Sequence, residues 1–89
     1  MFFNFKLSKK FRTNLKKFSS EEQKQINNKL RLLTVDPFYP SLRSKCIHGA
    51  ADGVLESSVN MDIRIIWYYG DDGTIILADV GHHNIIDNY

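Results

Sequence analysis

The spacing of hydrophobic residues changes along the chain, from a helical period near its beginning to a strand period further on. Between residues 9 and 18, Phe11, Leu15 and Phe18 recur at i, i+4 and i+7, which places them in one stripe of a helix. Ser8 precedes this stripe and is a suitable N-cap, because its hydroxyl can accept a hydrogen bond from a free backbone N–H. The pattern therefore predicts an amphipathic helix over about residues 9–18.

A second helix is predicted to run to about Thr34. It begins with a capping box, in which Ser19 is the N-cap and the Glu22 side chain reaches back to the backbone of that residue. Its apolar stripe consists of Ile26, Leu30 and Leu33. Because the hinge between the two helices is short, we expect them to form an antiparallel hairpin.

Strand-like segments stand on both sides of this hairpin in the sequence. Phe2–Leu7 alternates loosely and predicts a first strand, and Ser41–Ile47 predicts a short edge strand after the helices. A turn is expected at Gly49–Gly53. Three further strands are predicted at Val54–Asn60, Ile63–Tyr69 and Thr74–Val80. Their short connections indicate an antiparallel meander, so the predicted fold is α+β, with two helices on one face of a mostly antiparallel sheet.

Alternation along the strands assigns side chains to the two faces of the sheet, because successive residues of a strand point in opposite directions. The residues expected in the core beneath the helices are Ile63, Ile65, Trp67 and Tyr69. Arg64 points the other way, and we place Glu56 and Ser58 of the preceding strand on the same open face.

The distribution of charge suggests a polyanionic partner. Residues 1–50 contain eleven Lys and Arg against three acids, a net charge of +8, whereas residues 51–89 contain one Arg against seven acids, a net charge of −6. A basic half of this kind suits nucleic acid or the ribosome. Solvated helix faces are an equally good explanation of the charge alone.

Several classes of protein are disfavoured by the composition. Cys46 is the only cysteine, so an internal disulfide is excluded and a reducing compartment is indicated. The cysteine and three histidines lack the spacing of metal ligands. No apolar run has the length of a membrane span, and no signal-peptide pattern is present. We expect a cytoplasmic protein with no metal, no small-molecule cofactor and no membrane partner.

Arg64 is a candidate for phosphate recognition, because it is a lone cation among isoleucines and aromatic residues. Its guanidinium can offer a rigid fork of N–H donors to a phosphate. The alternative is a structural ion pair with Glu56 or Asp62 on a neighbouring strand. Either acid could instead act as a general base if its surroundings shift its pKa, or could be a surface charge.

Histidines and tyrosines supply the remaining candidates. His82 and His83 follow a glycine at a predicted strand end, where a side chain with a pKa near neutrality could transfer protons. The alternative is a turn histidine bonded to nearby backbone. His48 is a weaker candidate of the same kind. Tyr68 and Tyr89 could stack on bases.

Three segments resemble parts of a known family of proteins. They are Tyr39–Lys45 (YPSLRSK), Glu56–Trp67 (ESSVNMDIRIIW) and Leu77–His83 (LADVGHH). They look like segments of the RelE/ParE superfamily of toxins from bacterial type II toxin–antitoxin pairs, in particular its RelE/YafQ-like mRNA interferase branch. The most specific parts are the SVNMD-x-R core and the final GHH, and the resemblance covers essentially the whole chain. It implies one toxin domain over residues 1–89 with a microbial RNase-like fold.

The resemblance also implies an activity and partners. Such a toxin enters the ribosomal A site and cuts messenger RNA, by attack of a ribose 2′-hydroxyl on the adjacent phosphate to leave a cyclic phosphate. A cognate antitoxin would block the site. Two alternatives stay open: a non-catalytic inhibitor of gyrase in the manner of ParE, and a degenerate module that only binds its antitoxin.

Roles are carried over by matching positions in the sequence. Arg64 matches the strand arginine that stabilises the transition state, and His83 matches the position of a general acid. Tyr89 falls where several relatives place an aromatic residue that orients the scissile nucleotide. The residues expected to contact RNA are Arg43, Lys45, His48 and His82.

The sequence departs from the family pattern in three respects. Ser57 and Ser58 occupy strand positions where some relatives have histidine or lysine, so the usual base is missing and Glu56, Asp62 or His82 would take its part. Ile63 stands where some relatives have an aromatic residue. A C-terminal helix is not expected, because the chain stops soon after the GHH segment.

Overall fold

The computed structural model describes residues 3–49 and 53–89, and its centre is a five-stranded sheet in the order β1-β5-β4-β3-β2. The strands are β1 (Phe5–Leu7), β2 (Lys45–Cys46), β3 (Leu55–Ser58), β4 (Ile63–Tyr69) and β5 (Ile75–His82). Strands β2 to β5 pair antiparallel, and β1 joins the edge of β5 in parallel. The α+β prediction with an antiparallel meander is therefore confirmed.

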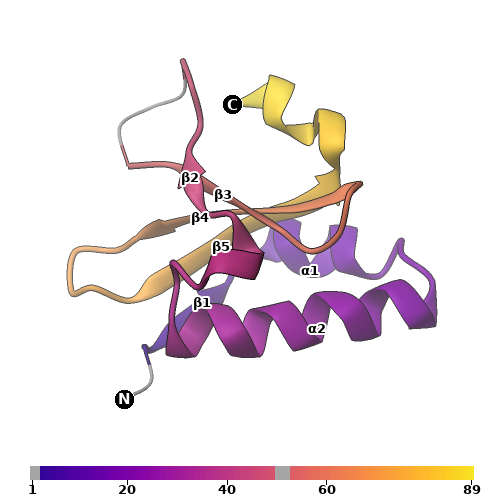
Figure 1. The fold of residues 1–89 in the computed structure, drawn as a ribbon, viewed down its shortest axis with the longest axis horizontal. Helices are drawn as coiled ribbons and strands as arrows, with labels where there is room; N and C mark the ends of the chain where they lie inside the picture. The colour runs from indigo at the N-terminus through magenta and orange to yellow at the C-terminus, as the bar shows by residue number, and fades with distance from the viewer. Residues whose placement is uncertain (1–2, 50–52) are drawn as a thin grey trace.

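Two helices, α1 (Lys9–Leu15) and α2 (Ser20–Val35), cover one face of this sheet (Figure 1). The Ser8 hydroxyl accepts the Phe11 N–H at 3.0 Å, as expected of an N-cap. Both bonds of the predicted capping box are present, because Glu22 N–H donates to Ser19 Oγ at 3.1 Å and Ser19 N–H donates to Glu22 Oε1 at 3.0 Å. Local sequence thus fixes where each helix begins.

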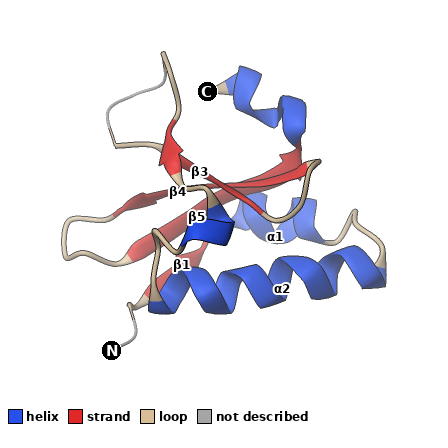
Figure 2. Ribbon diagram, viewed as in Figure 1, coloured by secondary structure: helices blue, strands red, loops and turns tan. Residues whose placement is uncertain are grey.

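The main hydrophobic core lies between these helices and the sheet. Side chains of α1, α2 and the central strands meet there without exposed surface, among them Phe11, Ile26, Leu33, Ile63, Ile65, Trp67 and Leu77. A second, smaller cluster of Ile47, Ile66 and Ile85 lies apart from the main core. It is covered by the 3₁₀ helix η2 (His83–Asn88), which lies on the other side of the sheet from α1 and α2 (Figure 2).

Two predictions near the C-terminal end of the sequence were wrong. A C-terminal helix was not expected, yet η2 forms directly after the sheet because Ile85 and Ile86 can bury apolar surface against Ile66. The last strand also extends two residues further than predicted, so His82 ends β5 and only His83 lies beyond it. This extension separates the two histidines into different elements.

Other details also differ from the prediction. Residues 40–42 form the 3₁₀ turn η1 (Pro40–Leu42) instead of extended chain, because proline at its first position fixes a helical φ and leaves no N–H to pair. The edge strand is accordingly reduced to β2. Tyr69 is 40% exposed instead of buried, since it lies at the margin of the core, edge-on to the Trp67 ring. The predicted turn at Gly49–Gly53 falls partly outside the described residues.

No helix in the described part of the chain is both long and apolar enough to cross a membrane.

Candidate active site

A small hollow lies on the face of the sheet opposite α1 and α2, next to the beginning of η2. Its volume is about 170 Å³. It is lined by Arg43, Lys45, Glu56, Ser58, Arg64, His83 and Ile86. We call it the central hollow. It brings together three predicted catalytic residues, Glu56, Arg64 and His83, and confirms that Glu56, Ser58 and Arg64 share a face.

Arg64 lies on β4 directly opposite Ser58 of β3, and its guanidinium is held by backbone carbonyls of the β3–β4 turn. Nη1 donates to Asn60 O at 2.7 Å and to Ile63 O at 3.1 Å, and Nη2 donates to Met61 O at 3.2 Å. These three bonds leave two of its five N–H donors for another acceptor. The turn therefore fixes the plane of the guanidinium without satisfying it completely.

Glu56 provides the carboxylate beside this guanidinium, with Oε1 3.8 Å from Arg64 Nε. The ion pair that the sequence offered as a structural alternative is thus present. Glu56 is only 6% exposed, and Arg64 is its one ion-pair partner among the described residues. A nearly buried carboxylate with a single, long ion-pair contact retains lone pairs that can accept a proton.

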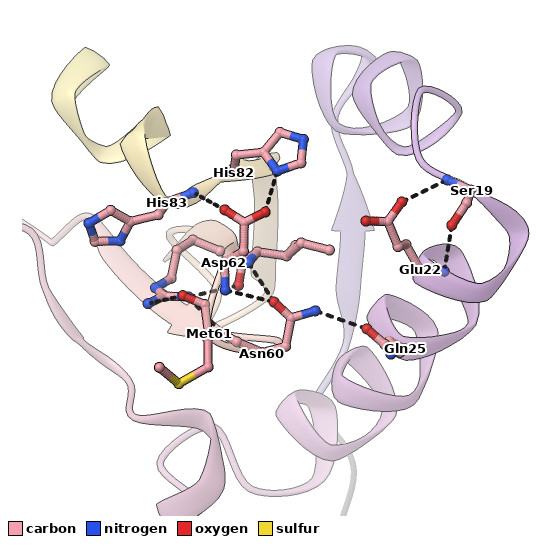
Figure 3. A network of polar contacts seen from close by, with 10 residues as sticks. Ser19, Glu22, Gln25, Asn60, Met61, Asp62, His82 and His83 are labelled. Carbon is pink, nitrogen blue, oxygen red and sulfur yellow. Dashed lines mark hydrogen bonds and ion pairs between the residues drawn. The ribbon is translucent and has the colours of Figure 1, made fainter.

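The two histidines point to different places (Figure 3). The His83 ring lines the central hollow, whereas His82 borders a separate groove between α1, β5 and η2. His82 Nδ1 is 2.6 Å from Asp62 Oδ2, and its ring centroid is 5.2 Å from that of Phe18. The His83 backbone N–H donates to Asp62 Oδ1 at 3.3 Å.

Asp62 itself does not line the central hollow, and both of its oxygens are engaged by these histidines. The hydrogen bond from His82, followed by the one from the His83 N–H, holds the pKa of Asp62 below its ordinary value. Such a carboxylate binds a proton less readily than a free one.

Several solved structures share the fold of this chain at low sequence identity. The toxin–antitoxin complex RelBE2 from Mycobacterium tuberculosis aligns over 93% of this chain and 100% of that chain, with a TM-score of 0.76 and 14% identity. The DinJ–YafQ toxin–antitoxin complex from Escherichia coli aligns over 96% and 97%, with a TM-score of 0.76 and 13% identity. The archaeal RelE–RelB complex from Pyrococcus horikoshii aligns over 92% and 96%, with a TM-score of 0.75 and 15% identity. The chain has the fold of RelE-type toxins.

Comparison of the sequence with protein-family models and with curated proteins finds no match. The RelE-like fold is therefore established by the three-dimensional likeness, which extends over nearly the whole of each aligned chain. The resemblance inferred from the sequence segments is confirmed at the level of this fold.

Of the residues predicted to contact RNA, Arg43 and Lys45 line the central hollow and His48 lines a hollow beside it, whereas His82 borders the separate groove. Lys45 and Glu56 also line a neighbouring hollow of about 600 Å³, to which His48 and Tyr89 contribute. The Tyr89 hydroxyl is occupied there, because it donates to Asp79 Oδ2 at 2.7 Å and accepts from Lys10 Nζ at 3.1 Å. Burial, and then the bond to Asp79, raise the pKa of Tyr89.

A third hollow, of about 300 Å³, adjoins the central one on its other side and shares Arg43, Ser58 and Arg64 with it. Arg43 has a left-handed backbone conformation with φ of 49°, which is uncommon for a residue with a side chain.

Ser58 was not predicted as a site residue, although its expected position beside Arg64 in the sheet was an available signal.

Asp79 is the other residue that sequence analysis missed. It is 1% exposed, and its carboxylate accepts from Asn14 Nδ2 at 2.6 Å and from the Val80 N–H at 2.9 Å, besides the Tyr89 hydroxyl. Lys10 Nζ lies 3.3 Å from its Oδ2. The signal in the sequence that could have identified Asp79 was the presence of an acidic residue within the apolar run of β5. No three His, Cys, Asp or Glu side chains of the described ranges, 3–49 and 53–89, converge as a metal site requires.

Proposed function

We propose that this chain is the toxin of a type II toxin–antitoxin pair, acting as one domain over residues 1–89 that cuts messenger RNA on the ribosome. The observation that carries the proposal is the central hollow, in which an arginine with free donors, a nearly buried carboxylate and a histidine ring meet. These are the groups that RNA cleavage by an internal 2′-hydroxyl requires.

In the proposed reaction, the scissile phosphate lies in the central hollow against Arg64. Glu56 accepts the proton of the ribose 2′-hydroxyl as its oxygen attacks the adjacent phosphorus. Arg64 donates hydrogen bonds to the pentacoordinate phosphate, whose negative charge increases during the attack. His83 gives a proton to the departing 5′-oxygen. The products are a 2′,3′-cyclic phosphate and a 5′-hydroxyl, so no water or cofactor is consumed.

The shape of the surface explains why a ribosome would be needed. The three hollows follow one another along an open face, so they can accept an extended single strand but cannot enclose it. Arg43 and Lys45 would contact backbone phosphates, while His48 and the Tyr89 ring would contact the neighbouring nucleotide. The ribosomal A site would supply the orientation that this shallow surface lacks.

The experiment adds purified protein to a reconstituted translation reaction, with and without ribosomes, and maps messenger RNA ends by primer extension. We expect cuts in phase with codons that require ribosomes and disappear with Arg64→Ala. Arg31→Ala on α2 is a matched control, since it removes an arginine that does not line the hollows on the open face. Intact message together with trapped gyrase–DNA complexes would replace this proposal with the gyrase alternative.

We also propose a cognate antitoxin as the stable partner. The solved structures that share this fold include toxin–antitoxin complexes. Several aromatic side chains are about half exposed, including Phe5 on the edge strand β1 at 49% and Phe38 after α2 at 56%, and could be covered by a partner segment. Co-expression with the protein encoded beside it should give a soluble complex and relieve growth arrest. Harmless expression of the unpartnered wild-type chain would favour the degenerate module instead.

A further inference from the structure

The β3–β4 turn contains a carboxylate that links the two histidines at the end of β5. We propose that Asp62 is a positioning residue, which caps η2 from outside and so fixes the His83 ring at the central hollow. This inference rests on the proposed nuclease function, because it assigns His83 the role of proton donor. It also gives Asp62 a role other than that of the general base considered from the sequence.

The first observation is that η2 lacks a cap of its own. Its N-cap residue, His82, makes no side-chain bond to the free N–H groups of the helix. The N–H of His83, the first residue of η2, instead donates to Asp62 Oδ1 at 3.3 Å. Free N–H groups at the start of a helix need acceptors, and a carboxylate there also interacts favourably with the helix dipole. Asp62, in the β3–β4 turn, therefore supplies the hydrogen-bond acceptor that the side chain of an N-cap residue normally supplies.

The second observation is that the same carboxylate also holds His82, the residue before His83 (Figure 3). Asp62 Oδ2 is 2.6 Å from His82 Nδ1, and the His82 ring is held on its other side by Phe18. One carboxylate thus contacts two consecutive residues at the point where β5 ends. The side chains of His82 and His83 leave the backbone in different directions. Holding both residues in place therefore also fixes where the His83 ring lies.

The third observation is that the turn holding Asp62 is also the one that holds Arg64. Asn60 Oδ1 accepts the backbone N–H groups of Asp62 and Ile63, each at 2.8 Å, and Asn60 Nδ2 donates to Gln25 Oε1 on α2 at 2.9 Å. The carbonyls of this turn bind the Arg64 guanidinium. A single turn therefore determines the position of both the phosphate-binding cation and, through Asp62, the histidine.

Proton transfer by Asp62 itself is a poorer explanation of this geometry. Its side chain is 60% exposed and does not line the hollow where the phosphate is proposed to lie. Its oxygens already accept from two donors, which lowers its pKa and weakens it as a base. Because the side chain is exposed, it can be replaced without leaving a cavity in the core.

The structural part of the test is hydrogen exchange of backbone amides, measured by NMR on the whole chain. We expect the His83 amide to exchange faster in Asp62→Ala and to stay protected in Asp62→Asn, because asparagine is as good a capping residue as aspartate. Asp71→Ala, in the exposed β4–β5 turn, is the matched control and should leave His83 protection unchanged. Unchanged His83 exchange in Asp62→Ala would overturn the cap.

The kinetic part measures multiple-turnover cleavage of messenger RNA on purified ribosomes. We expect Asp62→Ala to lower kcat by about 10-fold to 100-fold without changing KM, as small misplacements of a catalytic group do. Asp62→Asn should remain within about threefold of wild type, because its oxygen can still cap η2. In a His83→Ala background, Asp62→Ala should have almost no further effect, because the two residues act as one unit.

The alternatives give different results. A general base at position 62 would make Asp62→Asn as inactive as Asp62→Ala, and would make Asp62→Ala harmful even in the His83→Ala background. Either result overturns the positioning role while leaving the nuclease function intact. If the wild-type chain cuts no RNA, the proposed function fails, and the exchange measurement alone then supports or overturns the cap.

Discussion

Two nearly buried carboxylates lie in the same row of the sheet, on either side of Ile66, and their surroundings differ sharply. Glu56 on β3 and Asp79 on β5 both pair with Ile66 on β4, so all three side chains share one face. Asp79 is bonded by Asn14, Tyr89, Lys10 and the Val80 N–H, whereas Glu56 has one ion-pair contact, at 3.8 Å, within the part of the chain that the structure describes. Burial alone does not distinguish them.

What distinguishes the two carboxylates is whether the protein satisfies them. A carboxylate with all its acceptor sites occupied stabilises the fold and has little capacity to take a proton. The bonds of Asp79 attach Tyr89, at the end of η2, to α1 and so hold η2 over Ile66. Glu56 lines the central hollow, where its carboxylate has unused lone pairs and the neighbouring Arg64 has unused N–H donors. Groups of this kind are available to a substrate.

The largest expected effect comes from replacing the Glu56 carboxylate by an amide. Glu56→Gln keeps the size of the side chain but removes its basicity, so we expect cleavage to fall by about 10²-fold to 10⁴-fold. Thermal stability should change little, because only a long ion pair is lost. Single-turnover cleavage on ribosomes and a melting curve measure the two quantities. Near-normal cleavage by Glu56→Gln would remove Glu56 from the chemistry.

The paired histidines offer a second comparison of the same kind. His83→Ala removes the ring from the central hollow, and we expect about 10²-fold slower cleavage, as for the loss of a general acid. His82→Ala is the matched control one residue earlier, and it should retain more activity because the Asp62 cap on the His83 N–H remains. Equal losses in both variants would contradict separate roles.

The sequence predicted Glu56 much better than it predicted Asp79. Strand alternation alone placed Glu56, Ser58 and Arg64 on one face, because all three lie in adjacent strands joined by a short turn. Two partners of Asp79 are Asn14, 65 positions before it in α1, and Tyr89, 10 positions after it at the C-cap of η2. No local pattern carries such contacts.

The contacts of the Tyr89 hydroxyl were not visible in the sequence for the same reason. Tyr89 was matched to an RNA-contacting role by position, but its hydroxyl bonds to Asp79 and Lys10, the latter 79 residues away. The prediction that it orients the scissile nucleotide stays a prediction for its ring, which borders the hollow shared with Glu56 and His48. Asp62 and Arg64 were predicted near one another, and the turn that joins them explains why local sequence was sufficient.

A smaller effect is expected on stability when the Asp79 cluster is disturbed. Asp79→Asn keeps one oxygen but removes the charge that attracts Lys10, so the free energy of unfolding should fall by about 1–3 kcal/mol, as for hydrogen bonds to charged groups. Urea denaturation gives this value. Cleavage per folded molecule should stay near that of wild type at low temperature, the opposite of the Glu56→Gln result. A large loss of cleavage in a fully folded Asp79→Asn would show that the cluster also sets the site.

The smallest expected effect is the alkaline response of this cluster. The bond from Lys10 to Tyr89, and then its contact with Asp79, raise the pKa of Lys10, and burial raises the pKa of Tyr89. Groups whose pKa is raised by folding add stability below their unfolded pKa, and that stability is lost as pH rises through the folded pKa. The ordinary values are 10.5 and 10.0, so the loss should begin above about pH 10.

Tyr89→Phe separates this response from general alkaline unfolding. The variant should be less stable than wild type by about 1 kcal/mol at pH 8, the typical net worth of a hydrogen bond. Above pH 10 the difference should shrink, because the wild-type hydroxyl then loses the proton that it donates to Asp79. Urea midpoints measured between pH 8 and pH 11 follow this convergence. A constant gap across that range would mean that the Tyr89 ring, rather than its hydroxyl, attaches η2 to the rest of the fold.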